Sequence, residues 1–164
     1  MTPQLLGQLI DDHAAALTLF ARQWCAAPED VVQEAFVKLS AQRPLPNDPV
    51  GWLFRVVRNG ASSAARADRR RQRHETGAAA HRPAWFAATE NAAIDGTDAA
   101  AALETLAIEE REVVVAHLWG GLTFEQIGQL AGVSSSTAHR RYLKALSTLR
   151  ERLRVPCPNP STLD

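Results

Sequence analysis

The chain lacks the features of a secreted, membrane-spanning or disulfide-bonded protein. It has two cysteines in 164 residues, Cys25 and Cys157, which are too few for a disulfide framework. No apolar run approaches the roughly 20 residues that a helix needs to cross a bilayer. The N-terminus does not have the basic and then apolar pattern of a signal peptide. These absences favour a cytoplasmic protein without a membrane segment.

Signatures of catalysis are missing as well. No phosphate-binding loop is present, and no serine or cysteine stands in the setting of a known nucleophile motif. The five histidines have no metal-ligand spacing; they are His13, His74, His81, His117 and His139. We therefore expect no enzymatic activity, no metal site and no cofactor.

The charge is balanced overall but unevenly distributed along the chain. The formal net charge is zero, which by itself argues against a nucleic-acid ligand. Residues 55–73, however, contain seven arginines against one aspartate, and residues 122–154 contain six Lys/Arg against two glutamates. Between them, residues 74–112 contain eight Asp/Glu against two arginines. Two basic segments of this kind indicate a polyanionic partner.

Apolar residues recur at helical spacing through most of the chain, and strand-like alternation is rare, so we predict an all-α fold. Three prolines within 43–49 interrupt this pattern. The expected helices are Gln4–Ala26, one from Pro28, one from about Pro49 into the arginine cluster, Ala99–Trp119, Phe124–Ala131 and Ser135–Leu153. We predict two small helical domains, 1–73 and 99–154, joined by a flexible linker, 74–98, and followed by a frayed tail, 155–164.

The segment from Leu122 onward has the pattern of a helix-turn-helix. Thr123 is a good N-cap, and Gln126 stands where it completes a capping box. Gly132 falls where the turn needs a positive φ, and Ser134 can cap the second helix. The apolar residues of the first helix lie on one face: Phe124, Ile127 and Leu130. We therefore predict a helix-turn-helix in the C-terminal domain.

The second helix of this motif separates apolar from basic residues. Its predicted core side is formed by Ala138, Tyr142, Ala145, Leu149 and Leu153. A recognition helix presents polar and basic side chains from its N-terminal end to base edges and phosphates. The candidate DNA contacts are Ser135, Ser136, Thr137, His139, Arg140, Arg141 and Lys144. The alternative is a solvated charged face on an ordinary helical hairpin.

The helix that starts near Pro49 has a different basic feature. Its predicted inward side is formed by Trp52, Leu53, Val56, Val57, Gly60 and Ala64. Its opposite side carries Arg55, Arg58, Ser62, Arg66 and Arg69. An arginine stripe with few acids suits a DNA backbone. A solvated face is again the alternative, although such faces usually mix charges of both signs.

Taken together, these segments resemble the small extracytoplasmic-function sigma factors of the sigma-70 family. The resemblance covers residues 10–153 and is carried by Pro28–Leu39, Gly51–Asn59, Glu109–Val115, Gly121–Gly128 and Thr137–Leu149. Three departures affect the expected promoter sequence. Ser63 stands where the family usually has Asp, Ala107 stands where it has Pro, and serines 134–136 replace a turn with Pro and Gly.

The resemblance implies a sigma factor that directs core RNA polymerase to promoters and initiates transcription. The expected partners are the beta-prime clamp and beta flap of the core, promoter DNA and an anti-sigma protein, which no residue identifies. The clamp-binding residues would be Glu29, Asp30, Gln33 and Glu34. Recognition and melting of the minus-ten element would fall to Asn47, Asp48, Arg55, Arg58, Asn59, Ser62, Arg66 and Arg69. The loop 45–48 would receive a flipped base, and the recognition helix would read the minus-thirty-five element.

Two non-enzymatic alternatives remain open at this point. A transcription regulator with a helix-turn-helix and a helical partner-binding N-terminal domain explains the C-terminal half equally well. It does not explain the arginine-rich segment that follows Trp52. A protein-binding adaptor is disfavoured by the same arginine stripe.

Overall fold

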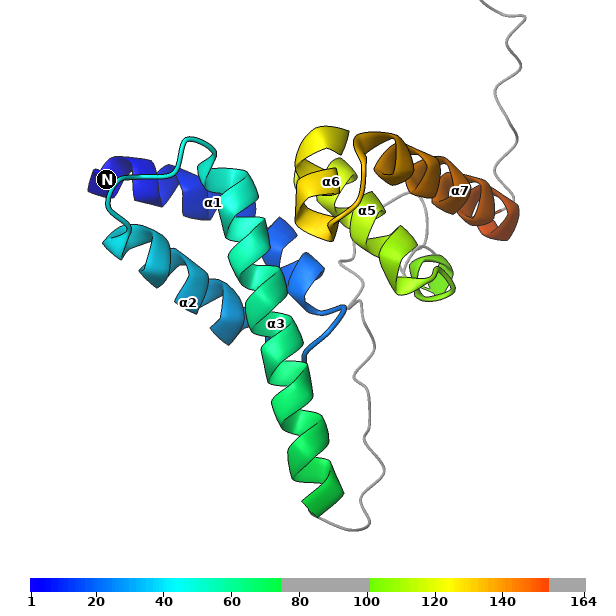
Figure 1. The fold of residues 1–164 in the computed structure, drawn as a ribbon, viewed down its shortest axis with the longest axis horizontal. Coiled ribbons are helices and arrows are strands. Elements are labelled where there is room, and N and C mark those ends of the chain that lie inside the picture. The colour runs from blue at the N-terminus through cyan, green and yellow to red at the C-terminus, as the bar shows by residue number, and fades with distance from the viewer. Residues whose placement is uncertain (75–100, 154–164) are drawn as a thin grey trace, which may run out of the picture.

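The computed structural model describes residues 1–74 and 101–153, and its regular elements within these ranges are all helical (Figure 1). The helices are α1 (Pro3–Ala21), α2 (Pro28–Ala41), α3 (Pro49–His74), α5 (Ile108–Leu118), α6 (Phe124–Ala131) and α7 (Ser135–Leu153). The predicted all-α class is confirmed. Apart from His74, the predicted linker lies outside the described residues, as does the predicted tail.

The N-terminal half is a three-helix unit in which α1 and α2 both pack against α3 and against each other. Its core is apolar, and Leu17, Phe20, Leu39 and Leu53 are fully buried. Each of these helices begins with a proline at its first turn, where the missing N–H has no intrahelical acceptor to lose. The C-terminal part of α3 extends beyond the other described helices (Figure 1).

The first helix is shorter than predicted. We expected it to reach Ala26, but α1 ends at Ala21, and Arg22 forms its C-cap. Pro28 fixes the start of α2, so the chain has to reverse direction within residues 22–27. Trp24 lies in this turn, and its ring packs edge-on against Phe20 with centroids 4.9 Å apart. The helical spacing of the local sequence therefore continues past the end of the helix, and spacing alone misplaces this boundary.

The predicted helix Ala99–Trp119 is also wrong as a single element. Residues 101–104 are helical, the chain then turns, and α5 begins only at Ile108. Ala107, the N-cap of α5, has an extended backbone at φ −57° and ψ 149°. The Arg111 guanidinium donates hydrogen bonds to the carbonyl oxygens of Leu103, at 2.8 Å, and Leu106, at 3.2 Å. It thereby ties the start of α5 to the turn that precedes it.

The helix-turn-helix forms as predicted. Thr123 and Gln126 make a complete capping box at the start of α6. Gly132 has φ 70°, which an L-residue rarely adopts, and the N–H of Val133 donates to the carbonyl of Gly128. The Ser134 hydroxyl accepts from the N–H of Thr137 at 3.2 Å. Local signals were sufficient here because each of these contacts spans five residues or fewer.

The two halves of the chain pack directly against each other, with α1 against α5 and α3 against α6. The buried side of α3 differs from the predicted inward stripe. Phe54, Ala61 and Ala65 are buried, whereas Trp52 and Val56 of the predicted stripe are only partly so. A Cβ on Gly120, just after α5, would lie 2.5 Å from Cζ of Phe54. The halves are therefore in close contact at this point.

Gly128 generates the first prediction. A Cβ at this position would lie 2.8 Å from the Val133 carbonyl oxygen and 3.1 Å from the Ser135 nitrogen. Both are backbone atoms of the turn, so they cannot move aside as a flexible side chain would. We expect Gly128→Ala to lower the free energy of unfolding by about 1–3 kcal/mol, as overpacking typically does. Equilibrium urea denaturation of the full chain measures this change.

Gly7→Ala is the matched control. Gly7 lies inside α1, and a Cβ there would meet no atom within 4 Å. Because alanine loses less backbone entropy in a helix, this substitution should raise stability by about 0.5–1 kcal/mol. Equal effects from the two substitutions would contradict the steric explanation.

Candidate nucleic-acid interface

The recognition helix α7 is anchored on one side and exposed on the other. Ala138 and Ala145 are buried, as predicted, while Tyr142 and Leu149 are partly buried. Along the N-terminal part of α7, the exposed candidate contacts are Ser135, Ser136, His139 and Arg140, with Thr137 and Arg141 partly buried. The backbone N–H groups of the first turn have no intrahelical acceptors, which suits a phosphate.

An aromatic cluster fixes α7 relative to the two helices before it. The ring of Phe124 stacks on His117 at 4.4 Å and meets His139 edge-on at 4.8 Å. Tyr142 packs edge-on against His117 at 4.9 Å. His117 is itself held by its Nδ1, which lies 2.8 Å from the carbonyl oxygen of Leu122. His139, a candidate DNA contact, therefore has its ring orientation set by α6.

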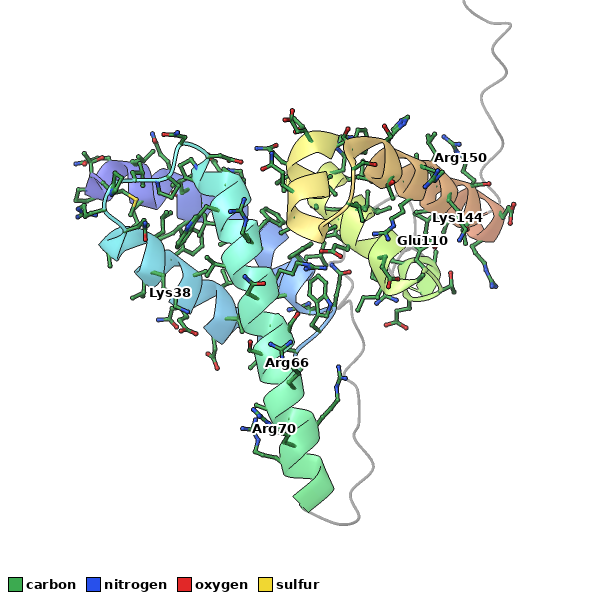
Figure 2. The ribbon with its side chains drawn as sticks, in the orientation of Figure 1. Lys38, Arg66, Arg70, Glu110, Lys144 and Arg150 are labelled. Carbon is green, nitrogen blue, oxygen red and sulfur yellow. The ribbon has the colours of Figure 1, made fainter. Side chains whose placement is uncertain are left out.

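The basic residues of α7 differ in how they are held. Within the described ranges, Arg140 makes no hydrogen bond or ion pair, and its side chain is exposed. The Lys144 ammonium, by contrast, pairs with the Glu110 carboxylate of α5 at 2.6 Å (Figure 2). A DNA contact by Lys144 would therefore have to replace its ion pair with Glu110. Arg140 could contact DNA without breaking an ion pair within the chain.

The basic face of α3 is only partly free. Arg55, Arg66 and Arg69 are exposed, and Arg66 and Arg70 lie on the projecting part of the helix (Figure 2). Arg66 donates to the Ser63 hydroxyl at 3.0 Å, which orients its guanidinium along the helix. The candidate Ser62, in contrast, is partly buried.

Arg58 is engaged by the other half of the chain. Its Nε and Nη2 donate to the two carboxylate oxygens of Glu112 on α5, at 2.5 and 3.4 Å. The side chain of Glu112 is 3% exposed and that of Arg58 is 33% exposed. Desolvation by this burial raises the pKa of Glu112, although Arg58 and then Arg141 act in the opposite direction. Glu112 therefore depends on its arginine partner to remain charged in this position.

The two candidate residues of the loop before α3, Asn47 and Asp48, differ in their contacts. Asn47 is exposed, but Asp48 caps α3, because its Oδ1 accepts from the N–H of Gly51 at 2.9 Å. The Oδ2 of Asp48 accepts from Nε2 of Gln126 on α6 at 2.8 Å. Asp48 therefore has a structural role at the contact between the halves, in addition to its predicted place in the minus-ten set.

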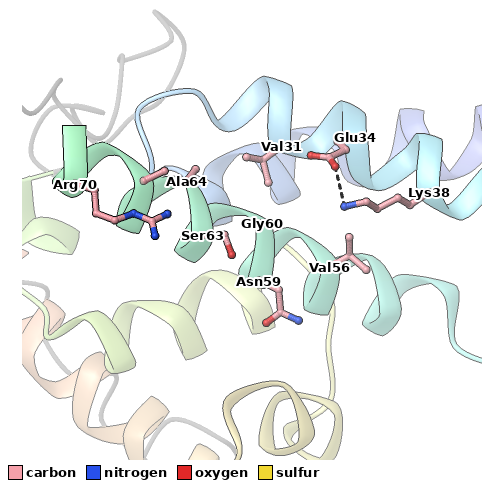
Figure 3. A pocket seen from close by; sticks show the side chains of 10 residues that line it. Val31, Glu34, Lys38, Val56, Asn59, Gly60, Ser63, Ala64 and Arg70 are labelled. Carbon is pink, nitrogen blue, oxygen red and sulfur yellow. Dashed lines mark ion pairs between the residues drawn. The ribbon is translucent and has the colours of Figure 1, made fainter. Parts of the chain in front are cut away.

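A groove of about 710 Å³ runs between α2 and α3 (Figure 3). Val31 and Val56 contribute apolar surface, and Asn59 lies at its edge. Glu34 of α2 also lines it. The groove is therefore lined both by Glu34, a predicted clamp-binding residue, and by Asn59, a predicted promoter-binding residue.

The acidic side of α2 is exposed as predicted. Glu29 pairs with Arg22 at 3.2 Å, and Glu34 pairs with Lys38 at 2.8 Å (Figure 3). The pKa of Glu29 is lowered, chiefly by a hydrogen bond from its own backbone N–H at the helix start and further by Arg22. Asp30 and Gln33 are exposed and make no ion pair or side-chain hydrogen bond within the described ranges.

Residues 1–74 and 101–153 contain neither a candidate metal site nor a candidate membrane-spanning helix. In these ranges, no group of three or more His, Cys, Asp or Glu side chains is placed to hold a metal ion. Within the same ranges, no helix has the length and apolarity needed to span a membrane. Cys25 is buried as a small apolar residue, and this burial raises the pKa of its thiol.

Sequence reasoning missed the residues that join the two halves. Glu112 and Gln126 were included in segments of the family resemblance, and Gln126 also in a capping box, but neither was predicted to join the two halves. No local signal identifies their partners, because Arg58 is 54 positions from Glu112 and Asp48 is 78 positions from Gln126. The opposite charges of the two segments were the only available indication.

Two family models match the chain. Sigma-70 region 2 matches residues 9–71, and Sigma-70, region 4 matches residues 102–151. The RNA polymerase sigma factor CarQ of Myxococcus xanthus is 33% identical over 78% of this chain and 75% of its own length. The probable RNA polymerase sigma factor RfaY of Xanthomonas campestris pv. campestris is 29% identical over 92% of this chain. This chain covers 40% of the length of RfaY.

Solved structures share the fold. The sigma factor RpoE of Bartonella quintana, in complex with the anti-sigma factor NepR, aligns with a TM-score of 0.75 at 22% identity. That alignment covers 95% of this chain and 100% of the other. CnrH, in complex with the cytosolic domain of CnrY, aligns with a TM-score of 0.59 at 24% identity, over 93% and 90% of the two chains.

Proposed function

Because the chain belongs to the sigma-70 family of RNA polymerase sigma factors, with the region 2 and region 4 pair of the extracytoplasmic-function group, we propose that it directs core polymerase to specific promoters. The observation that carries this proposal is the presence of two exposed basic surfaces on separate helices of one chain. They lie on α3 and α7, and an acidic surface lies on α2. A subunit that brings polymerase to promoters needs a DNA-binding surface for each of the two promoter elements and a third surface for the polymerase.

The basic residues of α7 and α3 assign the two promoter elements to different helices. The N-terminal turns of α7 read the minus-thirty-five element in the major groove, with Arg140 on a base edge and His139 and Arg141 on the backbone. On α3, Arg55, Arg66 and Arg69 hold phosphates of the minus-ten element. Asn59 borders this face and contacts a base of the opened strand, since its amide can both donate and accept.

The remaining partners are proteins. Asp30 and Gln33, with Glu29 and Glu34, form the surface for the beta-prime clamp, and the C-terminal half contacts the beta flap. By likeness to RpoE, which was solved with the anti-sigma factor NepR, we extend the proposal to an anti-sigma partner. The protein works in the cytoplasm, where polymerase is found, and has no catalytic activity of its own.

Run-off transcription with purified core polymerase tests the function directly. Genomic fragments from the source bacterium serve as templates, and transcripts that depend on this chain are mapped to their start sites. We expect specific start sites preceded by shared minus-ten and minus-thirty-five sequences. Dimeric binding to DNA without any effect on core polymerase would contradict the proposal and favour a conventional helix-turn-helix regulator.

Arg140 and Arg141 should have separable effects on promoter choice. Losing a paired Arg–guanine contact costs about 1–3 kcal/mol at that base, whereas losing a phosphate contact weakens all sequences alike. We expect Arg140→Ala to change the preferred minus-thirty-five sequence and Arg141→Ala to lower activity without changing it. Selection from a randomised minus-thirty-five library with each holoenzyme measures both. An unchanged preference for Arg140→Ala would remove Arg140 as a base reader.

Core binding should depend on the acidic surface of α2. Reversing its charge with Asp30→Lys and Glu34→Lys should weaken affinity for core polymerase, and neutral Asp30→Ser with Glu34→Gln should have a smaller effect. Circular dichroism checks that helicity is retained. Asp11→Lys with Asp12→Lys, at two exposed positions on α1, is the charge-matched control. Equal core affinity for all of these variants in a titration would exclude α2 as the clamp-binding surface.

A further inference from the structure

The chain has two lysines, and both are held in ion pairs within it. Lys38 of α2 pairs with Glu34 at 2.8 Å (Figure 3). Lys144 of α7 pairs with Glu110 of α5 at 2.6 Å (Figure 2). Arg140 precedes Lys144 by one turn of α7 and, within the described ranges, makes no ion pair. Two neighbouring cations of the recognition helix therefore differ in how freely they can meet DNA.

The pair between Lys144 and Glu110 is buried on one side only. The side chain of Glu110 is 10% exposed, whereas that of Lys144 is 74% exposed. In the part of the chain that the structure describes, Lys144 is the one ion-pair partner of Glu110. A buried carboxylate that loses its cation is left uncompensated, because little water can reach it. Separating the pair therefore costs free energy mainly at Glu110, and this cost favours a Lys144 that stays beside α5.

The position of Lys144 along α7 suits a phosphate contact better than a base contact. It lies roughly two and a half turns beyond Ser135, where α7 begins, at 3.6 residues per turn. A recognition helix reads base edges with its N-terminal residues, so a side chain this far along faces the DNA backbone. A lysine meets a phosphate as a point charge and carries no sequence information. A released Lys144 would therefore strengthen binding to every DNA sequence alike.

We propose that Glu110 is a positioning residue that holds Lys144 away from DNA phosphates and so lowers the affinity of α7 for DNA of any sequence. This inference rests on the proposed function, in which α7 binds the minus-thirty-five element. A contact made equally to all sequences adds to non-specific binding, and a genome offers far more non-specific sites than promoters. By withholding this contact, Glu110 leaves binding to the side chains at the N-terminal end of α7, which include Arg140.

Glu110→Gln tests the proposal, because it removes the charge that holds Lys144 and keeps the size of the side chain. One added phosphate contact should steepen the slope of log affinity against log salt by about 0.9, which makes the gain about 3.5 times larger at about 50 mM than at about 200 mM salt. Holoenzyme reconstituted with purified core polymerase is titrated on a promoter duplex and on an unrelated duplex of equal length. Both should show the steeper slope, and the preferred minus-thirty-five sequence should not change.

Two further variants separate the release of Lys144 from other effects of the substitution. Glu109→Gln removes a carboxylate at the exposed neighbouring position of α5 and should leave the salt slope at the parent value. The double variant Glu110→Gln, Lys144→Gln lacks the released cation, so its slope should return to that of the parent. An equal increase with Glu109→Gln would contradict the proposal, since it would point to a general loss of charge repulsion. A slope that stays steep in the double variant would contradict it as well.

Amine acetylation examines the parent chain itself, so this result does not depend on how the variants fold. Because the chain has two lysines, mass spectrometry assigns each modified peptide without ambiguity. In the parent holoenzyme, promoter DNA should leave the acetylation rate of Lys144 unchanged. In the Glu110→Gln holoenzyme, the same DNA should slow it. Protection of Lys144 by DNA in the parent would mean that it contacts DNA despite Glu110, and the proposal would be wrong.

The outcomes distinguish this inference from the function on which it rests. If the parent holoenzyme binds and transcribes specific promoters but Glu110→Gln keeps the parent salt slope, then Glu110 does not withhold Lys144 from DNA, and the proposed function stands. If the parent chain supports no specific transcription with core polymerase, the proposed function fails, and the role of Glu110 fails with it.

Discussion

The burial of the first part of α3 between two groups of helices is the constraint on which the rest of the structure depends. Phe54 is fully buried, its ring packs edge-on against Phe20 of α1 at 5.0 Å, and its tip lies against Gly120 after α5. One aromatic side chain thus contacts both halves of the protein. Two polar pairs also join the halves: Arg58 with Glu112, and Asp48 with Gln126. The packing of Phe54 places the helices so that these side chains lie within reach of each other.

The uneven charge along the sequence has two consequences in the folded chain. Acidic residues of the central segment lie against basic residues of both flanking segments. Glu112 pairs with Arg58, and Glu110 pairs with Lys144. The protein thus neutralises part of the charge that it would offer to DNA. Arg140, Arg55 and Arg69 remain exposed outside these pairs, so the basic surfaces are reduced without being lost.

Burial explains why these internal pairs matter unequally. The side chain of Lys144 is 74% exposed and that of Glu110 is 10% exposed, so solvent screens this pair from the lysine side. Glu112 is almost completely buried, and its raised pKa reflects the cost of keeping a carboxylate there. Losing the arginine would leave that charge without compensation, which is a larger penalty than the pair itself is worth. Among these pairs, the one between the halves is therefore the more consequential.

Prediction from the sequence succeeded where the deciding contacts were local. The capping box at Thr123, the left-handed Gly132 and the serine cap of α7 all depend on partners within a few residues. The helix break before Ile108 was missed, although Ala107 had been recognised as standing at a position where the family has proline. The break is stabilised by Arg111, which bonds to carbonyls five to eight positions away, and helical periodicity carries no information about such a contact.

The sequence by itself determined the helical class, the helix-turn-helix and the basic faces of α3 and α7, because periodicity, caps and charge are properties of neighbouring residues. The tertiary structure decided which side of α3 is buried and that Arg58 and Asp48 point toward the other half of the chain. It also decided that Lys144 is paired while Arg140 is not. Each of these depends on which helices meet, and that is set by packing between segments tens of residues apart.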